Sequence, residues 1–181
     1  LYVPELDSTA HARGWESSEW TTRLEDVDGE VRRLAASLRS TEGLLVTADH
    51  GVIDVPGHSQ VLFDRAPELL EGLRFVAGEP RGLQLHFDSG AVERMADRWR
   101  ESESGRSWVA TRDEAIKAGW FGDVADEVKP RIGDGIVAAR KNIAYYDGRT
   151  AKSTSLAMVG QHGSWSPAEL QIPLLRFGAF A

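Results

Sequence analysis

The chain has 181 residues, of which 41% are hydrophobic and 27% charged, the balance of a folded globular protein rather than a disordered segment. It contains no run of about 18 consecutive apolar residues, so we predict no membrane span. The net charge of −7 argues against binding a nucleic-acid backbone, and the absence of cysteine leaves His, Asp and Glu as metal ligands.

Residues 1–57 are predicted to form a β-α-β unit of a mainly parallel sheet flanked by helices. Leu1–Leu6 is apolar enough for a strand, and a chain that opens inside a strand is expected to be the carboxyl-terminal portion of a longer protein. Residues 18–38 carry apolar side chains every three or four positions, which indicates a helix that Ser17 or Ser18 can cap. Leu44–Ala48 is predicted to be the next strand, and buried.

Residues 58–150 have a different character, with 16 acidic and 14 basic side chains evenly mixed. We predict an inserted α+β subdomain here, in which a helix packs on a small antiparallel sheet. Its predicted elements are a hairpin of Leu73–Ala77 and Gly82–Phe87, a helix capped by Ser89, a strand at Trp108–Thr111, a short helix at Asp113–Ala118 and strand-like residues Gly135–Tyr146.

Residues 151–181 are predicted to return to the α/β core. Leu156–Val159 is expected to be a strand, and Ser166-Pro167-Ala168-Glu169 has the cap, proline and glutamate of a helix start. Ile172–Phe177 is predicted to be a closing strand, placed at a sheet edge by Pro173.

Three groups of residues at predicted strand ends could bind a metal. Asp7 and His11 are four positions apart, so on a helix they would share one face and hold one cation; otherwise Asp7 only caps a turn. Asp49 and His50 precede a glycine after a strand, a pattern that an ordinary aspartate turn also produces. His162 by itself is a loop histidine and becomes a ligand only beside the others.

Together these residues favour zinc. Imidazole and carboxylate without thiolate are typical of catalytic zinc sites, and five such ligands exceed what a single four-coordinate ion needs. Two neighbouring ions are therefore expected. His58 and His86 lack this setting and are interpreted as structural or exposed.

Three segments resemble the type I phosphodiesterase and nucleotide pyrophosphatase family of the alkaline phosphatase superfamily. Residues 2–14 are similar to its Asp-x-x-x-His-x-x-Gly motif, and Thr47–Val52 to its Ser/Thr-Asp-His-Gly-Met motif with valine in place of methionine. Gly160–Ser164 is similar to its late Gly-x-His-Gly motif. The resemblance covers residues 1–57 and 151–181 well, whereas residues 58–150 match only as an insertion that the family tolerates.

The resemblance implies an alkaline-phosphatase-like fold and a site with two zinc ions. One ion would be held by Asp7, His11 and His162, and the other by Asp49 and His50. The family's nucleophilic threonine or serine, and a further aspartate, come from an amino-terminal half without a counterpart here, so no catalytic nucleophile is nominated. The implied activity of the intact protein is hydrolysis of phosphodiester or pyrophosphate bonds in nucleotide-type substrates, with this chain inactive alone.

Other functions remain open at this point. Another hydrolase of the superfamily, such as a phosphomonoesterase, phosphonate hydrolase or sulfatase, would use a similar arrangement of metal ligands. The chain could instead be a non-catalytic zinc-binding module, or a plain α/β domain with incidental histidines. A small-molecule substrate is the expected partner, and the missing half as a separate chain is a further one. A sheet cut at its first strand is expected to be only marginally stable.

Overall fold

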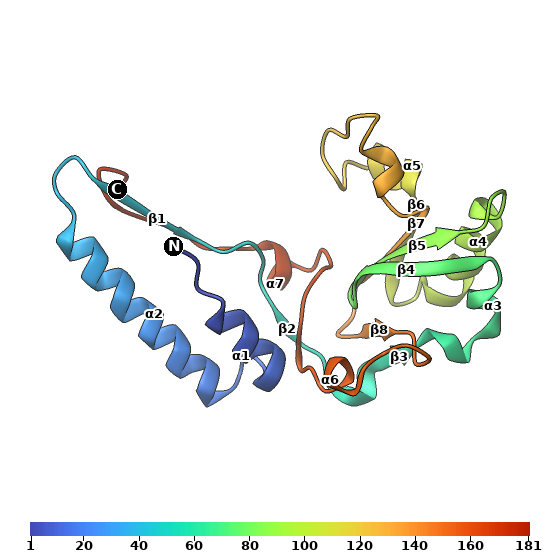
Figure 1. Cartoon of the computed structure of the whole chain (residues 1–181), viewed down its shortest axis with the longest axis horizontal. Helices are drawn as coiled ribbons and strands as arrows, with labels where there is room; N and C mark the ends of the chain where they lie inside the picture. Colours follow the sequence, from blue (N-terminus) through green and yellow to red (C-terminus); the bar gives the residue numbers. More distant parts are fainter.

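The computed structural model describes residues 1–181, and the chain forms two regions joined by short strands (Figure 1). The ribbon region contains α1 (Glu5–Arg13), α2 (Ser18–Ser37), β1 (Gly43–Thr47) and β10 (Leu174–Gly178). The sheet region contains β4 (Leu73–Glu79), β5 (Gly82–Phe87), α4 (Val92–Glu103), β6 (Ser107–Thr111) and β7 (Gly135–Ala139). None of the helices combines the length and apolarity that crossing a bilayer requires.

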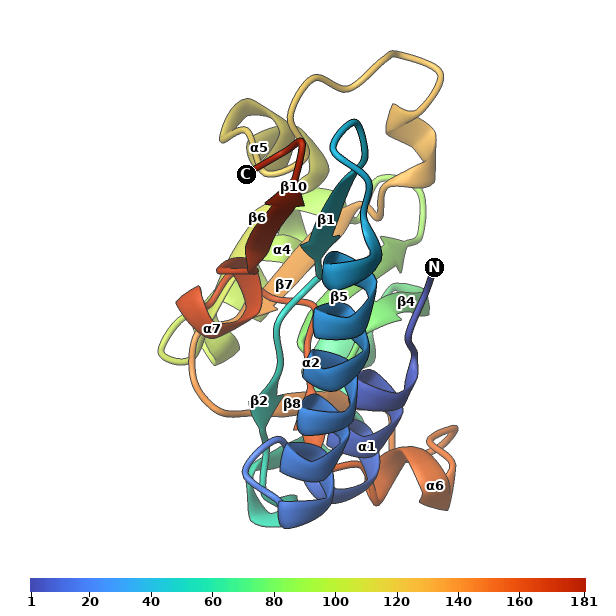
Figure 2. The same ribbon diagram turned by 90° about the vertical axis from the view of Figure 1, so that its left-hand side faces the viewer.

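The predicted helix of the ribbon region is confirmed as α2. Its N-cap is Ser17, whose hydroxyl accepts a hydrogen bond from the Trp20 amide at 3.1 Å. The strand predicted next is confirmed as β1, which pairs antiparallel with β10, from Gly43 opposite Gly178 to Thr47 opposite Leu174. Its predicted burial is wrong, because none of its residues is buried. Figure 2 shows these two strands side by side, with α2 extending below them in this view.

The strand predicted at Leu1–Leu6 is wrong, because helix α1 begins within it. Pro4 fixes a backbone angle compatible with a helix start, and Glu5 and Asp7 place negative charge in the first turn, where the helix dipole favours it. Without that strand the predicted parallel β-α-β unit does not form, and β1 has only the antiparallel partner β10. Within this chain the one parallel pairing is between β3 (Gln60–Leu62) and β8 (Ala144–Tyr146).

The sheet region confirms the predicted hairpin and has a core of its own. Its strand order is β4-β5-β7-β6, with every neighbouring pair antiparallel. Side chains of β5 alternate between buried and half-buried, as expected for a sheet with one covered face. Helix α4 covers that face with Met95, Ala96 and Trp99, and the predicted Ser89 cap is wrong because the N-cap is Ala91.

Short elements connect the two regions. Strand β2 (Ile53–Asp54) pairs antiparallel with β9 (Gly160–Gln161). The remaining helices are α3 (Pro67–Leu70), α5 (Arg112–Lys117), α6 (Ser153–Leu156) and α7 (Pro167–Leu170), with 3-10 turns at Gly57–Ser59, Phe63–Arg65 and Lys129–Arg131. The predicted capping box of α7 is confirmed, with Ser166 and Glu169 bonded reciprocally.

The structure contradicts two further predicted strand segments. Gly135–Tyr146 is not one strand-like segment but two strands in different sheets, β7 and β8. Leu156–Val159 is not a strand: Leu156 ends α6, and the extended residues start at Gly160, where backbone partners from β2 become available. The division of the chain at residues 57 and 150 stays a prediction.

Candidate metal centre

Helix α1 places Asp7 and His11 one turn apart on the same face. The distance from Asp7 Oδ1 to His11 Nε2 is 3.4 Å. The structure therefore confirms the helical spacing that the sequence analysis required for this pair, although the preceding strand is absent. The chain turns sharply after the helix at Gly14, where φ is +86° and a β-carbon would meet the carboxylate of Asp54.

His162 approaches this pair from the residue after β9. Its Nε2 lies 4.0 Å from Asp7 Oδ1. One ligand atom each from Asp7, His11 and His162 lies within 4.8 Å of the other two. The close approach of α1 to β9 requires Gly160, because a β-carbon there would lie 2.4 Å from the backbone oxygen of Ala10. Residues separated by about 150 positions thus converge on one point.

The backbone fixes how His11 faces that point. Its Nδ1 lies 2.8 Å from the carbonyl oxygen of Gly160, and a carbonyl only accepts, so Nδ1 carries the proton and donates it. The Nε2 lone pair is consequently directed at Asp7. This arrangement, in which one ring nitrogen donates to the protein and the other is free to ligate, is the usual one for a metal-binding histidine.

The environment of the Asp7 carboxylate shows whether these residues suit a cation. Its Oδ1 is buried and has no hydrogen-bond partner, and it is the oxygen that faces both imidazoles. A buried carboxylate oxygen without a partner is costly unless something positive satisfies it. Burial, together with neighbouring His50, lowers the pKa of His162, which keeps its ring neutral and able to ligate at pH 7. The donor set therefore fits a divalent metal such as zinc.

His50 and Asp49 lie beside this group. The ring of His50 stacks on that of His162, with 3.6 Å between centroids and 15° between planes. His50 Nδ1 donates to the carbonyl of Gly51 at 3.0 Å, which again leaves Nε2 free. Asp49 Oδ1 is 3.8 Å from that Nε2, but its side chain is 71% exposed. All five predicted ligands thus come to one place, whereas the tight three-residue group excludes Asp49 and His50.

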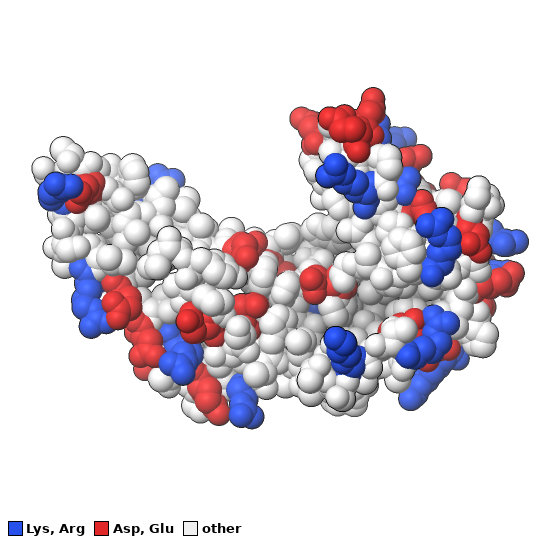
Figure 3. Space-filling model, in the orientation of Figure 1, with Lys and Arg blue, Asp and Glu red and all other residues white.

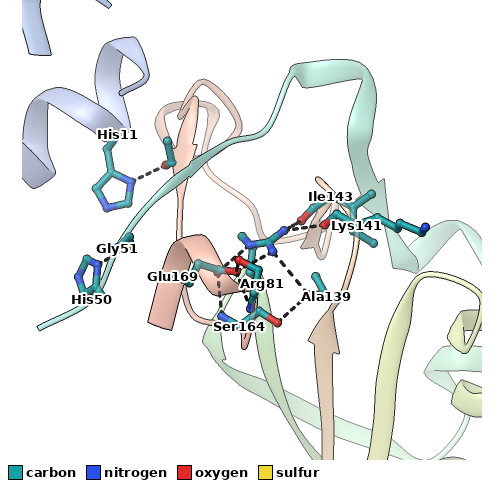
Figure 4. A network of polar contacts seen from close by, with 11 residues as sticks. His11, His50, Gly51, Arg81, Ala139, Lys141, Ile143, Ser164 and Glu169 are labelled. Carbon is teal, nitrogen blue, oxygen red and sulfur yellow. Dashed lines mark hydrogen bonds and ion pairs between the residues drawn. The ribbon is translucent and has the colours of Figure 1, made fainter. Parts of the chain in front are cut away.

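A buried polar network behind the site was missed by the sequence analysis (Figure 4). The Arg81 guanidinium donates to both carboxylate oxygens of Glu169, each at 2.8 Å. The sequence indicates Glu169 only as the cap partner of Ser166, and Arg81 only lies between the two predicted strands of the hairpin. Nothing in the spacing of 88 positions between them indicates that they meet.

The chain is similar to a known protein family and to several solved structures. The family model of type I phosphodiesterase / nucleotide pyrophosphatase matches residues 1–165. Murine ectonucleotide pyrophosphatase / phosphodiesterase 5, as an inactive variant in complex with AMP, is similar with a TM-score of 0.75 and 19% identity over 95% of this chain and 44% of that chain. No curated protein matches the chain.

Two further solved structures are similar. The human ectonucleotide pyrophosphatase / phosphodiesterase 5 has a TM-score of 0.75 and 15% identity, over 96% of this chain and 45% of that chain. Phosphonoacetate hydrolase from Sinorhizobium meliloti 1021, in complex with phosphonoacetate, has a TM-score of 0.68 and 17% identity, over 94% of this chain and 43% of that chain. The chain spans less than half the length of each.

These similarities confirm the expected α/β fold, which is alkaline-phosphatase-like. The mostly antiparallel pairing within the chain is compatible with that fold, because it concerns only the part of the fold that this chain covers. The match over residues 1–165 extends from the Asp7–His11 pair through His162. The chain belongs to the type I phosphodiesterase / nucleotide pyrophosphatase family.

Proposed function

We propose that this chain supplies most of the ligands of a two-zinc centre that hydrolyses phosphodiester or pyrophosphate bonds in nucleotide-type substrates. Asp7, His11 and His162 would hold one ion, and Asp49 and His50 would contribute to the other. The observation that carries the proposal is the buried, unpartnered Oδ1 of Asp7 facing two imidazole nitrogens. Membership of the family supports phosphoester hydrolysis as the reaction class.

The residues have separable tasks in this proposal. Paired divalent ions, when bound, supply charge stabilisation for the attacking and leaving oxygens of an in-line displacement. Asp7 brings a negative charge that offsets that of a cation. His11 is held in one tautomer by the Gly160 carbonyl, and His50 by that of Gly51, so neither ring must reorient before it can ligate.

The nucleophile is proposed to lie outside this chain. No serine or threonine here has the sequence context of the family's nucleophile, and the solved relatives are more than twice as long as the matched part. We propose that an amino-terminal portion, in the same protein or as a separate chain, supplies the nucleophile and a further aspartate. This chain alone is then expected to bind metal without turnover. The AMP complex of the murine relative supports a nucleotide substrate.

A phosphonate substrate is the second candidate, since phosphonoacetate hydrolase shares the fold. The two candidates differ in the bond broken, P–O against P–C. Turnover of bis(p-nitrophenyl) phosphate, p-nitrophenyl phosphate and phosphonoacetate by the complete protein separates diesterase, monoesterase and phosphonate hydrolase activities. Persistent absence of turnover after an amino-terminal portion is added would favour a non-catalytic zinc-binding module.

Zinc content is the first test of the centre. Elemental analysis of the purified chain, with intact mass measured on the same sample, is expected to give about one zinc per chain from the three-ligand group. His162→Ala is expected to lose that zinc. His86→Ala is the matched control, because His86 stacks on Phe75 in the sheet region and contacts no proposed ligand. A folded chain without zinc, or equal content in both variants, contradicts the proposal.

A further inference from the structure

We propose that the buried Arg81–Glu169 ion pair is the positioning device of the metal centre, because Glu169 holds both loops that present His50 and His162. The inference rests on the proposed function. Neither residue touches the metal-binding atoms. We propose that they fix the positions of the His50 and His162 imidazoles before any ion binds.

The side chain of Glu169 holds the His162 loop. Its Oε1 accepts a hydrogen bond from the amide of Ser164, two residues after His162, at 2.9 Å. The Ser164 hydroxyl donates to the Ala139 carbonyl at 2.7 Å, which ties the same loop to the end of β7. At Gly163, φ is +113° and a β-carbon would lie 2.6 Å from Glu79, so the loop passes close against the β4–β5 hairpin.

The main chain of Glu169 holds the His50 loop. Its carbonyl oxygen accepts a hydrogen bond from the amide of Gly51, the residue after His50, at 2.8 Å. The contact is close, because a β-carbon on Gly51 would lie 1.9 Å from the carbonyl oxygen of Ala168. One residue of the four-residue helix α7 therefore fixes loops that are more than 100 positions apart in the chain.

Arg81 anchors Glu169 to the sheet region (Figure 4). Besides its two hydrogen bonds to the carboxylate, Arg81 donates to the carbonyls of Lys141 at 2.8 Å and Ile143 at 2.7 Å. The side chains of Arg81 and Glu169 are 0% and 2% exposed. A planar guanidinium satisfied on two sides is stiff, so it fixes the carboxylate in angle as well as in distance.

Stability alone is a weak reason for this arrangement. The desolvation of two buried charges offsets much of their attraction, and apolar replacements of buried ion pairs are often equally stable. The pair does join four segments that carry few buried side chains near the site: the hairpin turn, α7, the His50 loop and the His162 loop. Fixing ligand geometry is what such outer residues do in metal centres, where their loss weakens affinity.

The chain contains a matched control for this test. Glu103 in α4 is also buried, with a side chain 2% exposed, and it accepts two hydrogen bonds from Arg106 at 2.6 Å and 2.9 Å. Tyr145 donates to it as well. Glu103→Gln therefore removes a buried, arginine-paired carboxylate in the sheet region without touching α7 or either histidine loop.

Titration of the 181-residue chain with Co²⁺ tests the inference, with competition by Zn²⁺ to confirm the site. Glu169→Gln is expected to weaken Co²⁺ affinity by about 10- to 100-fold and to change the visible spectrum of the bound ion. Glu103→Gln is expected to lower thermal stability but to leave Co²⁺ affinity and the spectrum unchanged. Arg81→Lys, which retains the charge and loses the planar fork, is expected to show an intermediate loss of affinity.

The outcomes separate this inference from the proposed function. Wild-type affinity and spectrum in Glu169→Gln would overturn the inference, and so would an equal loss of affinity in Glu103→Gln. If Glu169→Gln does not fold, Arg81→Lys takes its place. Wild-type Co²⁺ affinity and spectrum in Arg81→Lys would then overturn the inference. A folded wild-type chain that binds neither Co²⁺ nor Zn²⁺ overturns the proposed function instead.

Discussion

The ribbon region and the sheet region differ in how much of their surface they bury. In the sheet region, α4 and the facing strands enclose a core of 11 buried residues that includes Trp99, Met95 and Leu85. In the ribbon region, α1 buries only Ala10, while α2, β1 and β10 bury no residue. The ribbon region has regular secondary structure but no core of its own.

The proposed ligands lie in the poorly buried ribbon region or in the segments next to it. Asp7 and His11 are in the ribbon region, Asp49 and His50 lie in the loop after β1, and His162 lies in the connection between the regions. Their relative positions are consequently set by backbone contacts to β9 and α7 rather than by side-chain packing around them. Helix propensity and pairing of β1 with β10 give the ribbon region its shape, and α7 ties it to the sheet region.

The surface of the ribbon region is divided by charge. Figure 3 shows acidic and basic side chains along α2, whereas the β1–β10 strands are almost free of them, and the outline is hollowed between those strands and the segment with α5. Leu45 and Leu174 on these strands, and Phe180 just after β10, are each at least 50% exposed.

Truncating one apolar residue in each region should show the largest contrast. Trp99→Ala empties a site that is 0% exposed and is expected to destabilise the chain by about 3–5 kcal/mol. Leu34→Ala in α2, where the side chain is 42% exposed, is expected to cost less than about 1 kcal/mol. Urea unfolding followed by far-ultraviolet circular dichroism measures both, and similar losses would refute the contrast in burial.

Metal should stabilise the two regions unequally. Zinc at about 100 times its dissociation constant is expected to add about 2.7 kcal/mol to the folded state of any segment whose opening releases the ion. Hydrogen exchange should slow in α1 and at residues 160–164, and should not change in α4. Asp7→Ala is expected to abolish this protection. Uniform slowing across both regions would mean that they unfold as a single unit.

Acid should weaken the sheet region through Glu103. Burial raises the pKa of this carboxyl, but hydrogen bonds from Arg106, Tyr145 and Ser102 outweigh it, so the pKa lies below the ordinary 4.5. A lowered folded-state pKa contributes stability above the unfolded value and loses it as pH falls through the folded value. Thermal midpoints between about pH 6 and about pH 3 should fall less steeply in Glu103→Gln than in wild type. Equal slopes would contradict this assignment.

The surface charges of α2 should have the smallest effect. Arg32 pairs with Asp28 at 2.5 Å, but both side chains are more than 60% exposed. Arg32→Ala is therefore expected to change stability by about 0.5 kcal/mol or less, and less still in high salt. Urea midpoints at low and high salt check this, with Arg33→Ala as a second exposed pair on the same helix. A loss above about 1 kcal/mol would mean that α2 has a packing partner.

Sequence alone determined several local elements and indicated the candidate ligands, which stay a prediction. Apolar spacing predicted α2, two strand-like segments around a short turn predicted the hairpin of β4 and β5, and the Ser166–Glu169 pattern predicted the start of α7, because each depends on neighbours within a few residues. The five metal-binding candidates were also recognisable from local patterns: the four-residue spacing of Asp7 and His11, and the glycines beside His50 and His162. The strands predicted before Asp7 and before His162 do not form.

Tertiary structure alone decided the rest. Whether Leu1–Leu6 pairs as a strand depends on a partner strand, and none is present, so the acidic first turn of α1 prevails. That β1 pairs with β10, and that Arg81 meets Glu169 across 88 positions, depends on how the regions pack. Local periodicity specifies which residues face one way, whereas contacts between distant segments are set by the global balance of burial and hydrogen bonding.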